Sequence, residues 1–292
     1  METSDLKIET VGTYRAQWGE GPIWWENSLY YVDIEKKVVI QYKPKSGEEK
    51  KWDVSESVGR VGTVVPRSKG GLMVAGDNGI QFLNPETGET SFITDPETDK
   101  SDNRFNDGKC SPDGRFFAGT ISLVKNQGDA ALYRLDADLS LHTAFPNVTN
   151  SNGIAWSADS KTCFYIDTPT LSVFAFDYCT ETGNLSNQRT VINTEAIAAS
   201  PDGMTIDKAG NLWIAFCHGA CVVSYNPATG EELQRIDIPC LETTACAFGG
   251  ENLDELYITT GIHKSEVEED AGRLFRITGL STSGVATNAF AG

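Results

Sequence analysis

Four polar side chains that lie far apart in the sequence stand in the same local setting. Each is a carboxylate or carboxamide followed by a glycine or an Asp-Gly pair and then a short apolar run; the four are Glu20, Asn106, Asn152 and Asp202. Such oxygen ligands suit Ca²⁺ and, less selectively, Mg²⁺ or Mn²⁺, whereas Zn²⁺ is possible but normally recruits His or Cys. A single residue of this kind usually caps a strand start, but four equivalent ones favour one shared site. They therefore predict one divalent metal ion, with Ca²⁺ as the first expectation.

The segments that must position these side chains repeat along the chain. Six apolar, strand-like segments each follow a turn signal; they cover residues 29–33, 72–76, 116–120, 163–167, 212–216 and 256–260. Their first residues lie 43, 44, 47, 49 and 44 positions apart. This spacing is close to the period of about 40–50 residues that is typical of four-stranded propeller blades.

A second repeated signal has the same phase. Turns with Pro or Gly, such as 83–89 and 225–231, follow the recurring segments and predict the hairpin between the outer strands of each blade. The two signals predict an all-β protein, a six-bladed β-propeller that forms a single domain over residues 1–292. An alternating segment at about 5–13 is expected to close the last blade. The alternative is a pair of β-sandwiches whose strands have this spacing by coincidence.

Counting back from the recurring segments gives the positions of the four polar residues. They stand 9, 10, 11 and 10 residues before the first residue of their segment, in blades 1, 3, 4 and 5. We therefore expect them at one mouth of the channel, at the start of the innermost strands. Blades 2 and 6 offer Gly59-Arg60 and Thr243-Thr244 at this level, without a carboxylate.

Composition excludes several classes of partner. The net charge of −17 argues against nucleic acid and against anionic membrane surfaces. No apolar run reaches the roughly 18 residues of a membrane span, and residues 1–5 begin no signal peptide.

The chain has seven cysteines but no Cys-x-x-Cys motif, and we expect them to be free thiols, buried at Cys163, Cys240 and Cys246. Free thiols are typical of a cytoplasmic protein, which we expect here. The protein is further expected to be a monomer or weak dimer. The segment Cys217-His218-Gly219-Ala220-Cys221 could suggest a metal site, but because no second Cys/His pair is nearby it is interpreted as a strand end with two ordinary thiols.

Several motifs together resemble one known family. They are Gly19-Glu20-Gly21-Pro22, Arg104-Phe105-Asn106-Asp107-Gly108-Lys109, Phe117-Ala118-Gly119-Thr120, Ser151-Asn152-Gly153-Ile154-Ala155-Trp156-Ser157, Pro201-Asp202-Gly203-Met204-Thr205-Ile206-Asp207 and residues 248–259. This set is similar to the senescence marker protein/gluconolactonase/luciferin-regenerating enzyme (regucalcin-like) family, over nearly the whole chain. The resemblance implies a six-bladed propeller with one divalent metal in its channel.

The resemblance also implies roles for individual residues. Glu20, Asn152 and Asp202 match the family's metal ligands, and Asp202 also matches its catalytic acid/base. Arg104 and Asn106 match the pair that contacts substrate. Without the resemblance, a surface ion pair between Arg104 and Asp102 or Asp107 would be an equally good interpretation of Arg104. Val124 stands where lactonases of sugar acids in the family carry a Glu, which puts an aldonolactone substrate in doubt.

The expected function is that of a metal-dependent hydrolase of the lactonase type, acting on a small lactone or ester. A bound divalent ion can polarise the carbonyl, and Asp202 can accept a proton from water. One alternative is a hydrolase of organophosphates or other esters at the same site. The others are a calcium-binding regulatory protein without turnover and an interaction scaffold. No Gly-x-Ser-x-Gly motif supports a serine hydrolase.

Overall fold

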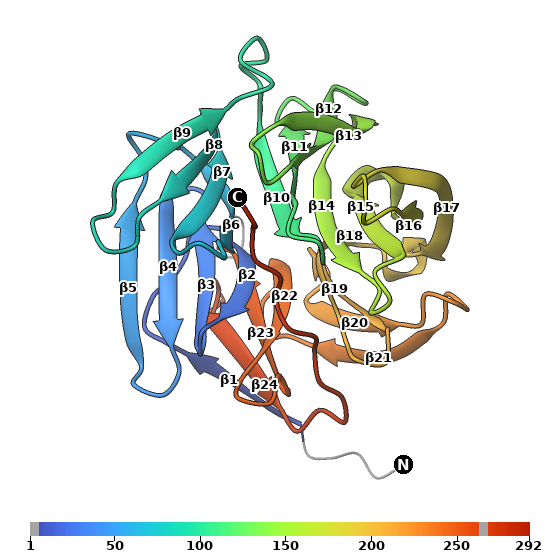
Figure 1. Cartoon of the computed structure of the whole chain (residues 1–292). Coiled ribbons are helices and arrows are strands. Elements are labelled where there is room, and N and C mark those ends of the chain that lie inside the picture. Colours follow the sequence, from blue (N-terminus) through green and yellow to red (C-terminus); the bar gives the residue numbers. More distant parts are fainter. Residues whose placement is uncertain (1–5, 263–267) are drawn as a thin grey trace.

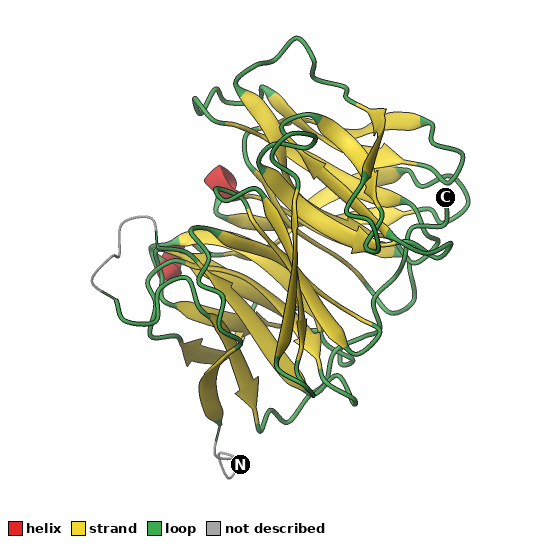
Figure 2. Cartoon of the chain, turned by 90° about the vertical axis from the view of Figure 1, so that its left-hand side faces the viewer, coloured by secondary structure: helices red, strands yellow, loops and turns green. Residues whose placement is uncertain are grey.

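The computed structural model describes residues 6–262 and 268–292, and regular structure in them is almost entirely β-strand (Figure 2). Residues 1–5, where no signal peptide is expected, lie outside the described part. The described residues form six antiparallel sheets of four strands each. Their helical structure is limited to two short 3₁₀ turns, η1 (Thr168–Thr170) and η2 (Glu195–Ile197). The six-bladed propeller predicted from the sequence is thereby confirmed, and the sandwich alternative is wrong.

The first five blades follow the chain, each running from its innermost to its outermost strand (Figure 1). Blades 1 and 2 consist of β2 (Gly19–Trp25), β3 (Ser28–Asp33), β4 (Val38–Lys43) and β5 (Glu48–Asp53), then β6 (Val61–Pro66), β7 (Leu72–Gly76), β8 (Gly79–Leu83) and β9 (Thr90–Thr94). Blade 3 consists of β10 (Asn103–Cys110), β11 (Phe116–Ser122), β12 (Ala130–Leu135) and β13 (Leu141–Val148). Blades 4 and 5 consist of β14 (Ser151–Trp156), β15 (Thr162–Asp167), β16 (Ser172–Tyr178) and β17 (Leu185–Asn193), then β18 (Ser200–Ile206), β19 (Leu212–Cys217), β20 (Cys221–Tyr225) and β21 (Glu232–Asp237).

The sixth blade joins the two ends of the chain. It contains β22 (Thr243–Gly249), β23 (Glu255–Thr260) and β24 (Leu274–Thr278), and its outer strand is β1 (Lys7–Val11) from the N-terminal region. In register, Lys7 lies opposite Thr278 and Val11 opposite Leu274. This pairing completes the sixth four-stranded sheet with a strand that precedes the first blade in the chain, and it thereby closes the ring of blades.

The recurring apolar segments of the sequence are the second strands of the six blades, β3, β7, β11, β15, β19 and β23. These strands are buried along most of their length because they are covered on both faces by neighbouring blades. The turn signals also have a structural basis. Gly88 and Gly230 adopt φ of 78° and 75°, and their N–H groups donate to the backbone carbonyl oxygens of Asn84 and Asn226, both at 2.8 Å. Gly adopts this left-handed conformation without steric cost.

The six innermost strands, β2, β6, β10, β14, β18 and β22, form a ring in which each contacts the next. Each of them has a register shift against the second strand of its blade, within its first half. Such bulges redirect side chains and bend the strand. In blades 3 and 5 the extra residues include Asn106 and Asp202 themselves. The sequence pattern predicted the residues but not the bulges.

Glycines beside the bulges allow the inner strands to approach one another. A Cβ atom on Gly203 would lie 2.3 Å from the Cβ of Ala245, and one on Gly153 would lie 2.8 Å from the carbonyl oxygen of Asp202. Real Cβ atoms essentially never come so close. The glycines after Asn152 and Asp202 are therefore a packing requirement of the ring, which accounts for the Asn-Gly and Asp-Gly pairs of blades 4 and 5.

A C-terminal segment covers one end of the ring, where it appears in red across the centre of Figure 1. Gly284 pairs with Asp207 of blade 5, and Phe290 pairs with Arg67 of blade 2. Phe290 is fully buried and packs beside Phe82, over which the Arg67 guanidinium lies. The chain end thus links blades that are distant in the sequence. In Figure 2 it lies on the side of the molecule opposite to the two 3₁₀ turns.

Candidate functional site

The structure brings all five candidate residues to one end of the channel. Glu20, Arg104, Asn106, Asn152 and Asp202 line a single cavity of about 830 Å³. They come from the innermost strands β2, β10, β14 and β18, as the counting from the sequence predicted. All five are buried within the channel mouth, with exposed fractions of 4–8%.

A chain of hydrogen bonds connects the candidate substrate and metal residues. Arg104 Nη1 donates to Asn106 Oδ1 at 2.8 Å and to the Phe105 carbonyl oxygen at 2.9 Å. Asn106 Nδ2 in turn donates to Asn152 Oδ1 at 3.2 Å and to the Ser151 carbonyl oxygen at 2.7 Å. Asn106 therefore fixes the amide orientation of Asn152 and the position of one arm of the guanidinium.

The same chain continues to the fifth blade. Asn152 Nδ2 donates to Thr168 Oγ1 at 2.7 Å, and Thr168 Oγ1 donates to the carbonyl oxygen of Pro201 at 2.9 Å. Pro201 precedes Asp202, so Thr168, in η1, connects the two candidate ligands across the gap between blades 4 and 5. Because its nitrogen is used by Thr168, the Asn152 amide presents its oxygen toward Asn106 and the cavity.

The two candidate carboxylate ligands, Glu20 and Asp202, both have raised pKa values. Burial, followed by repulsion from Asp107, raises the pKa of Glu20 to about 8. Burial, followed by repulsion from Glu20 and Asp107, raises the pKa of Asp202 well above its ordinary value. Carboxyl groups close together in a low-dielectric site favour binding of a cation, because a positive charge offsets both the desolvation and the repulsion.

Arg104 is a positive charge that counteracts the raised pKa values of both carboxylates, and it is itself buried. Burial, together with the neighbouring Arg60, lowers the pKa of Arg104 to about 10, so the guanidinium remains charged at neutral pH. Its Nε is buried and has no hydrogen bond within the part of the chain that the structure describes. The alternative of a surface ion pair with Asp102 or Asp107 is wrong, because Arg104 is 8% exposed and forms no such pair among the described residues.

These residues fit a hard divalent cation. Glu20 and Asp202 supply buried carboxylate oxygens, and Asn152 supplies an amide oxygen whose orientation is fixed by two hydrogen bonds. Oxygen donors of this kind are typical ligands of Ca²⁺, Mg²⁺ and Mn²⁺. Three protein ligands leave further positions for water and substrate.

Blades 2 and 6 complete the ring without acidic side chains. In blade 2 the bulge contains Gly62, while Arg60, which the sequence placed at the level of the polar residues, forms a bidentate pair with Asp77. In blade 6, Thr244 occupies the bulge, and its hydroxyl donates to the Gly19 carbonyl oxygen at 2.6 Å. Thr244 thus supports the backbone next to Glu20, while Arg60 does not contact the candidate ligands.

Val124 lies in the turn after β11, and 53% of its surface is exposed. The residues of this turn that line the cavity are Ser122 and Lys125, with Gln127 following. The wall that carries a Glu in lactonases of sugar acids therefore presents a hydroxyl, an ammonium and an amide group.

Two further residues of the cavity belong to the segment 217–221, whose interpretation as a metal site was set aside in the sequence for lack of a second Cys/His pair nearby. Cys217 and His218 line the cavity next to Asp202, and the carboxylate of Glu242 contacts both. Glu242 lies 25 positions after Cys217 in the sequence. It meets Cys217 only because blades 5 and 6 are adjacent, so no local spacing could have indicated the cluster.

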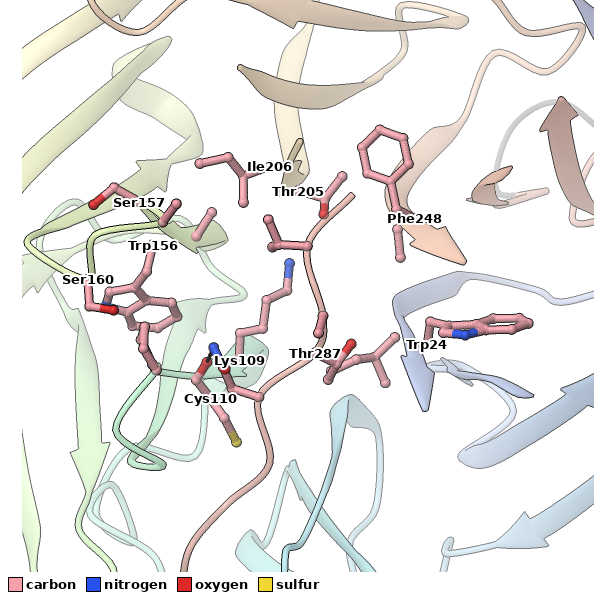
Figure 3. A pocket seen from close by; sticks show the side chains of 18 of the residues that line it. Trp24, Lys109, Cys110, Trp156, Ser157, Ser160, Thr205, Ile206, Phe248 and Thr287 are labelled. Carbon is pink, nitrogen blue, oxygen red and sulfur yellow. Dashed lines mark hydrogen bonds between the residues drawn. The ribbon is translucent and has the colours of Figure 1, made fainter. Parts of the chain in front are cut away.

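A separate cavity of about 270 Å³ lies at the opposite end of the inner strands. Figure 3 shows Trp24, Trp156 and Phe248 around the side chain of Lys109. Lys109 Nζ donates to the Met204 carbonyl oxygen at 2.6 Å, and burial lowers its pKa. None of the predicted site residues lines this cavity, and the C-terminal segment forms part of its wall.

Comparisons with known proteins agree with the motif resemblance. The model of the SMP-30/Gluconolactonase/LRE-like region matches residues 18–262. Regucalcin from Xenopus laevis is 37% identical over 305 residues, covering 99% of this chain and 100% of the relative. The solved structure of luciferin-regenerating enzyme superposes with a TM-score of 0.91 at 30% identity, covering 98% and 99% of the two chains. A regucalcin from Agrobacterium tumefaciens gives the same TM-score at 20% identity, covering 98% and 97%, and supports the fold.

The described residues contain no helix long and apolar enough to cross a membrane. All seven cysteines are free, and Cys163, Cys240 and Cys246 are buried, as expected from their apolar surroundings.

Proposed function

Because the chain belongs to the SMP-30/gluconolactonase/LRE-like family, we propose that it is a metal-dependent hydrolase of the lactonase type. The observation that supports this most is the convergence of five side chains in one cavity. Glu20, Asn152 and Asp202 are the proposed metal ligands, and Arg104 and Asn106 the proposed substrate contacts. The expected enzyme class agrees with the gluconolactonase description of the matching family.

The metal that these ligands would hold is a divalent cation, with Ca²⁺ as the first candidate. When bound, it would act as a Lewis acid toward the lactone carbonyl oxygen. Its charge would offset the burial and the carboxylate repulsion that raise the pKa values of Glu20 and Asp202, so both groups would be ionised. Asn152 would be held in a fixed orientation by Asn106 and Thr168.

The chain's own residues account for substrate orientation and proton transfer. A water molecule attacks the carbonyl carbon and forms the new C–O bond, while Asp202 accepts its proton. The C–O bond of the ring then breaks, and the proton passes to the leaving ring oxygen, so that the product is a hydroxy acid. A positioned general base of this kind is typically worth about 10²–10⁴ in rate.

Arg104 and Asn106 orient the substrate in this scheme. The guanidinium presents a planar set of donors that matches carbonyl, hydroxyl or carboxylate oxygens, and its Nε has no partner within the described chain. Ser122, Lys125 and Gln127 form the wall that would face the ring substituents. Since Val124 stands in place of a carboxylate, we expect lactones with few hydroxyl groups to be better substrates than sugar lactones.

A panel experiment tests the proposal. Purified protein, stripped with a chelator, is mixed with Ca²⁺, Mg²⁺, Mn²⁺ or Zn²⁺ and with hydroxylated and simple lactones, and acid release is followed in a pH-stat. We expect hydrolysis of at least one lactone with at least one metal, loss of that activity on chelation, and recovery on metal addition.

The rival functions give different results in the same panel. Metal binding without turnover of any lactone would indicate a calcium-binding regulatory protein. Faster hydrolysis of organophosphate than of lactone, with the same dependence on metal, would indicate the phosphoester alternative. Neither binding nor turnover would leave an interaction scaffold and contradict the proposal.

A further inference from the structure

A cluster of three different donor groups lies beside the candidate site, where blades 5 and 6 meet. Cys217 ends β19, and Glu242 immediately precedes β22; the two residues pair as an isolated antiparallel bridge. His218 follows Cys217 at φ 64°, a left-handed conformation that non-glycine residues adopt uncommonly. These backbone features hold a thiol, an imidazole and a carboxylate in one place.

The donor atoms are close enough to share one ion. Cys217 Sγ lies 3.3 Å from Glu242 Oε2, and His218 Nδ1 lies 2.7 Å from the same oxygen. One ligand atom from each residue lies within 4.8 Å of the others. Tetrahedral Zn²⁺ ligands at about 2.0–2.3 Å from the metal are separated by comparable distances, so small side-chain movements would accommodate the ion.

Only one of the two oxygens of the Glu242 carboxylate accepts hydrogen bonds from the described residues. Glu242 is 0% exposed, and its Oε1 has no hydrogen-bond partner within the part of the chain that the structure describes. A buried carboxylate oxygen without a partner is costly, and such groups are usually paired or bound to a metal. The cluster thus has a buried acceptor that its own hydrogen bonds do not use.

The cluster is also open on one side. The His218 side chain is 48% exposed, and both His218 and Cys217 line the large cavity. An ion held by the three residues would therefore keep a coordination position toward the cavity, as in zinc sites that bind water or substrate.

We propose that Cys217, His218 and Glu242 form a second cation site, separate from the Glu20–Asn152–Asp202 site, that binds Zn²⁺ or a similar borderline transition ion. The choice of ion follows from the donors, because thiolate and imidazole favour Zn²⁺ and its neighbours, whereas Ca²⁺ takes oxygen ligands. This inference goes beyond the proposed lactonase function and does not depend on it.

The rival explanation is a cluster held by hydrogen bonds alone, in which Glu242 accepts from the thiol and from the imidazole. A cysteine thiol that binds no metal is mostly protonated at neutral pH. Binding of a transition ion must therefore displace the thiol proton. A thiolate bond to the metal is the signature that separates the two explanations.

Cobalt(II) provides the spectroscopic probe. The full-length protein is titrated with Co²⁺ in the presence of excess Ca²⁺, which occupies the oxygen site, and thiolate-to-cobalt charge transfer is recorded. The background carries Cys179→Ser, because Cys179 is the exposed cysteine of the chain. Cys221→Ser is the matched control, since this thiol is buried four positions further along, outside the cluster.

We expect one equivalent of Co²⁺ with a charge-transfer band that Zn²⁺ displaces and Ca²⁺ does not. The band should persist in Cys221→Ser and in Glu20→Gln, and disappear in Cys217→Ser. His218→Ala removes a half-exposed ring and should therefore keep the fold. Because a ligand is lost, Co²⁺ binding should weaken by at least about 10- to 100-fold, the range typical for residues that only hydrogen-bond to a ligand. Absence of the band in the wild type, or unchanged Co²⁺ affinity in His218→Ala, overturns the proposal.

Discussion

At the scale of single residues, the candidate site is defined by a line of hydrogen bonds from Arg104 through Asn106 and Asn152 to Thr168. Arg104, Asn106 and Asn152 are buried, Thr168 is half-buried, and each orients the next. The two carboxylates of the same cavity, Glu20 and Asp202, have pKa values that are raised by burial and by repulsion from neighbouring carboxylates. The arrangement is costly for the protein alone and becomes favourable when a cation and a polar substrate are bound.

Arg104 offers a direct test of substrate binding at this scale. Arg104→Lys keeps the positive charge but removes the planar fork of donors. Loss of one hydrogen bond to a charged group costs about 1.5–3 kcal/mol, so KM for the best lactone should rise by roughly 10-fold or more. Steady-state kinetics at saturating metal measure the change. Arg235→Lys, on the exposed strand β21, is the control and should leave KM unchanged; an unchanged KM in Arg104→Lys would remove Arg104 from the substrate site.

At the scale of the elements, the bulged inner strands decide where the candidate residues point. Asn106 and Asp202 belong to the bulges of β10 and β18, and glycines beside them let adjacent strands come into contact. A Cβ on Gly203 would meet the Cβ of Ala245 in the next blade at 2.3 Å. The position of Asp202 therefore depends on a packing contact between blades.

Gly203→Ala tests this dependence. Overpacking of a filled interior costs about 1–3 kcal/mol, and we expect a loss of this size in the free energy of unfolding, together with weaker metal binding. Urea denaturation and a metal titration measure the two effects. In the double variant with Ala245→Gly, part of both losses should be recovered, because the closest contact is removed. No coupling between the two substitutions would show that the glycine is not needed for packing.

The elements also explain what the sequence could predict. The strands β3, β7, β11, β15, β19 and β23 were predictable because each is a short apolar run next to its own turn, and their spacing follows the blade length. The bulges could not be predicted, since they arise where neighbouring blades meet. For the same reason the Cys217–Glu242 contact was missed, and Gly59-Arg60 was placed at the level of the polar residues although the bulge of blade 2 lies at Gly62.

At the scale of the whole molecule, the two ends of the channel have different structures. The candidate site opens at one end, while the C-terminal segment covers the other and packs Phe290 into the core. The N-terminal strand β1 closes the sixth blade beside β24. Both chain ends thus contribute to the integrity of the ring rather than to the candidate site.

Phe290→Ala should separate stability from activity. Removing a fully buried Phe side chain costs about 3–5 kcal/mol, so the midpoint of thermal unfolding should fall clearly. Lactone hydrolysis well below that midpoint should be little changed, because the site lies at the opposite mouth. Val285→Ala in the same segment removes a partly exposed side chain and should have a small effect on stability. If Phe290→Ala loses lactone hydrolysis even at temperatures well below its unfolding midpoint, the two ends of the channel are coupled.

The central claim is that Asp202 both binds the metal and accepts the proton during lactone hydrolysis. The measurement that tests it most directly is kcat of Asp202→Asn for the best lactone at saturating metal, with metal occupancy determined in parallel. The near-isosteric amide keeps one ligand oxygen but cannot accept the proton. We expect metal still to bind and kcat to fall by at least about 10². The same substitution at the exposed Asp237 of blade 5 should leave kcat unchanged. If Asp202→Asn hydrolyses the lactone at nearly the wild-type rate with its metal bound, Asp202 is not the base and the proposed mechanism is wrong.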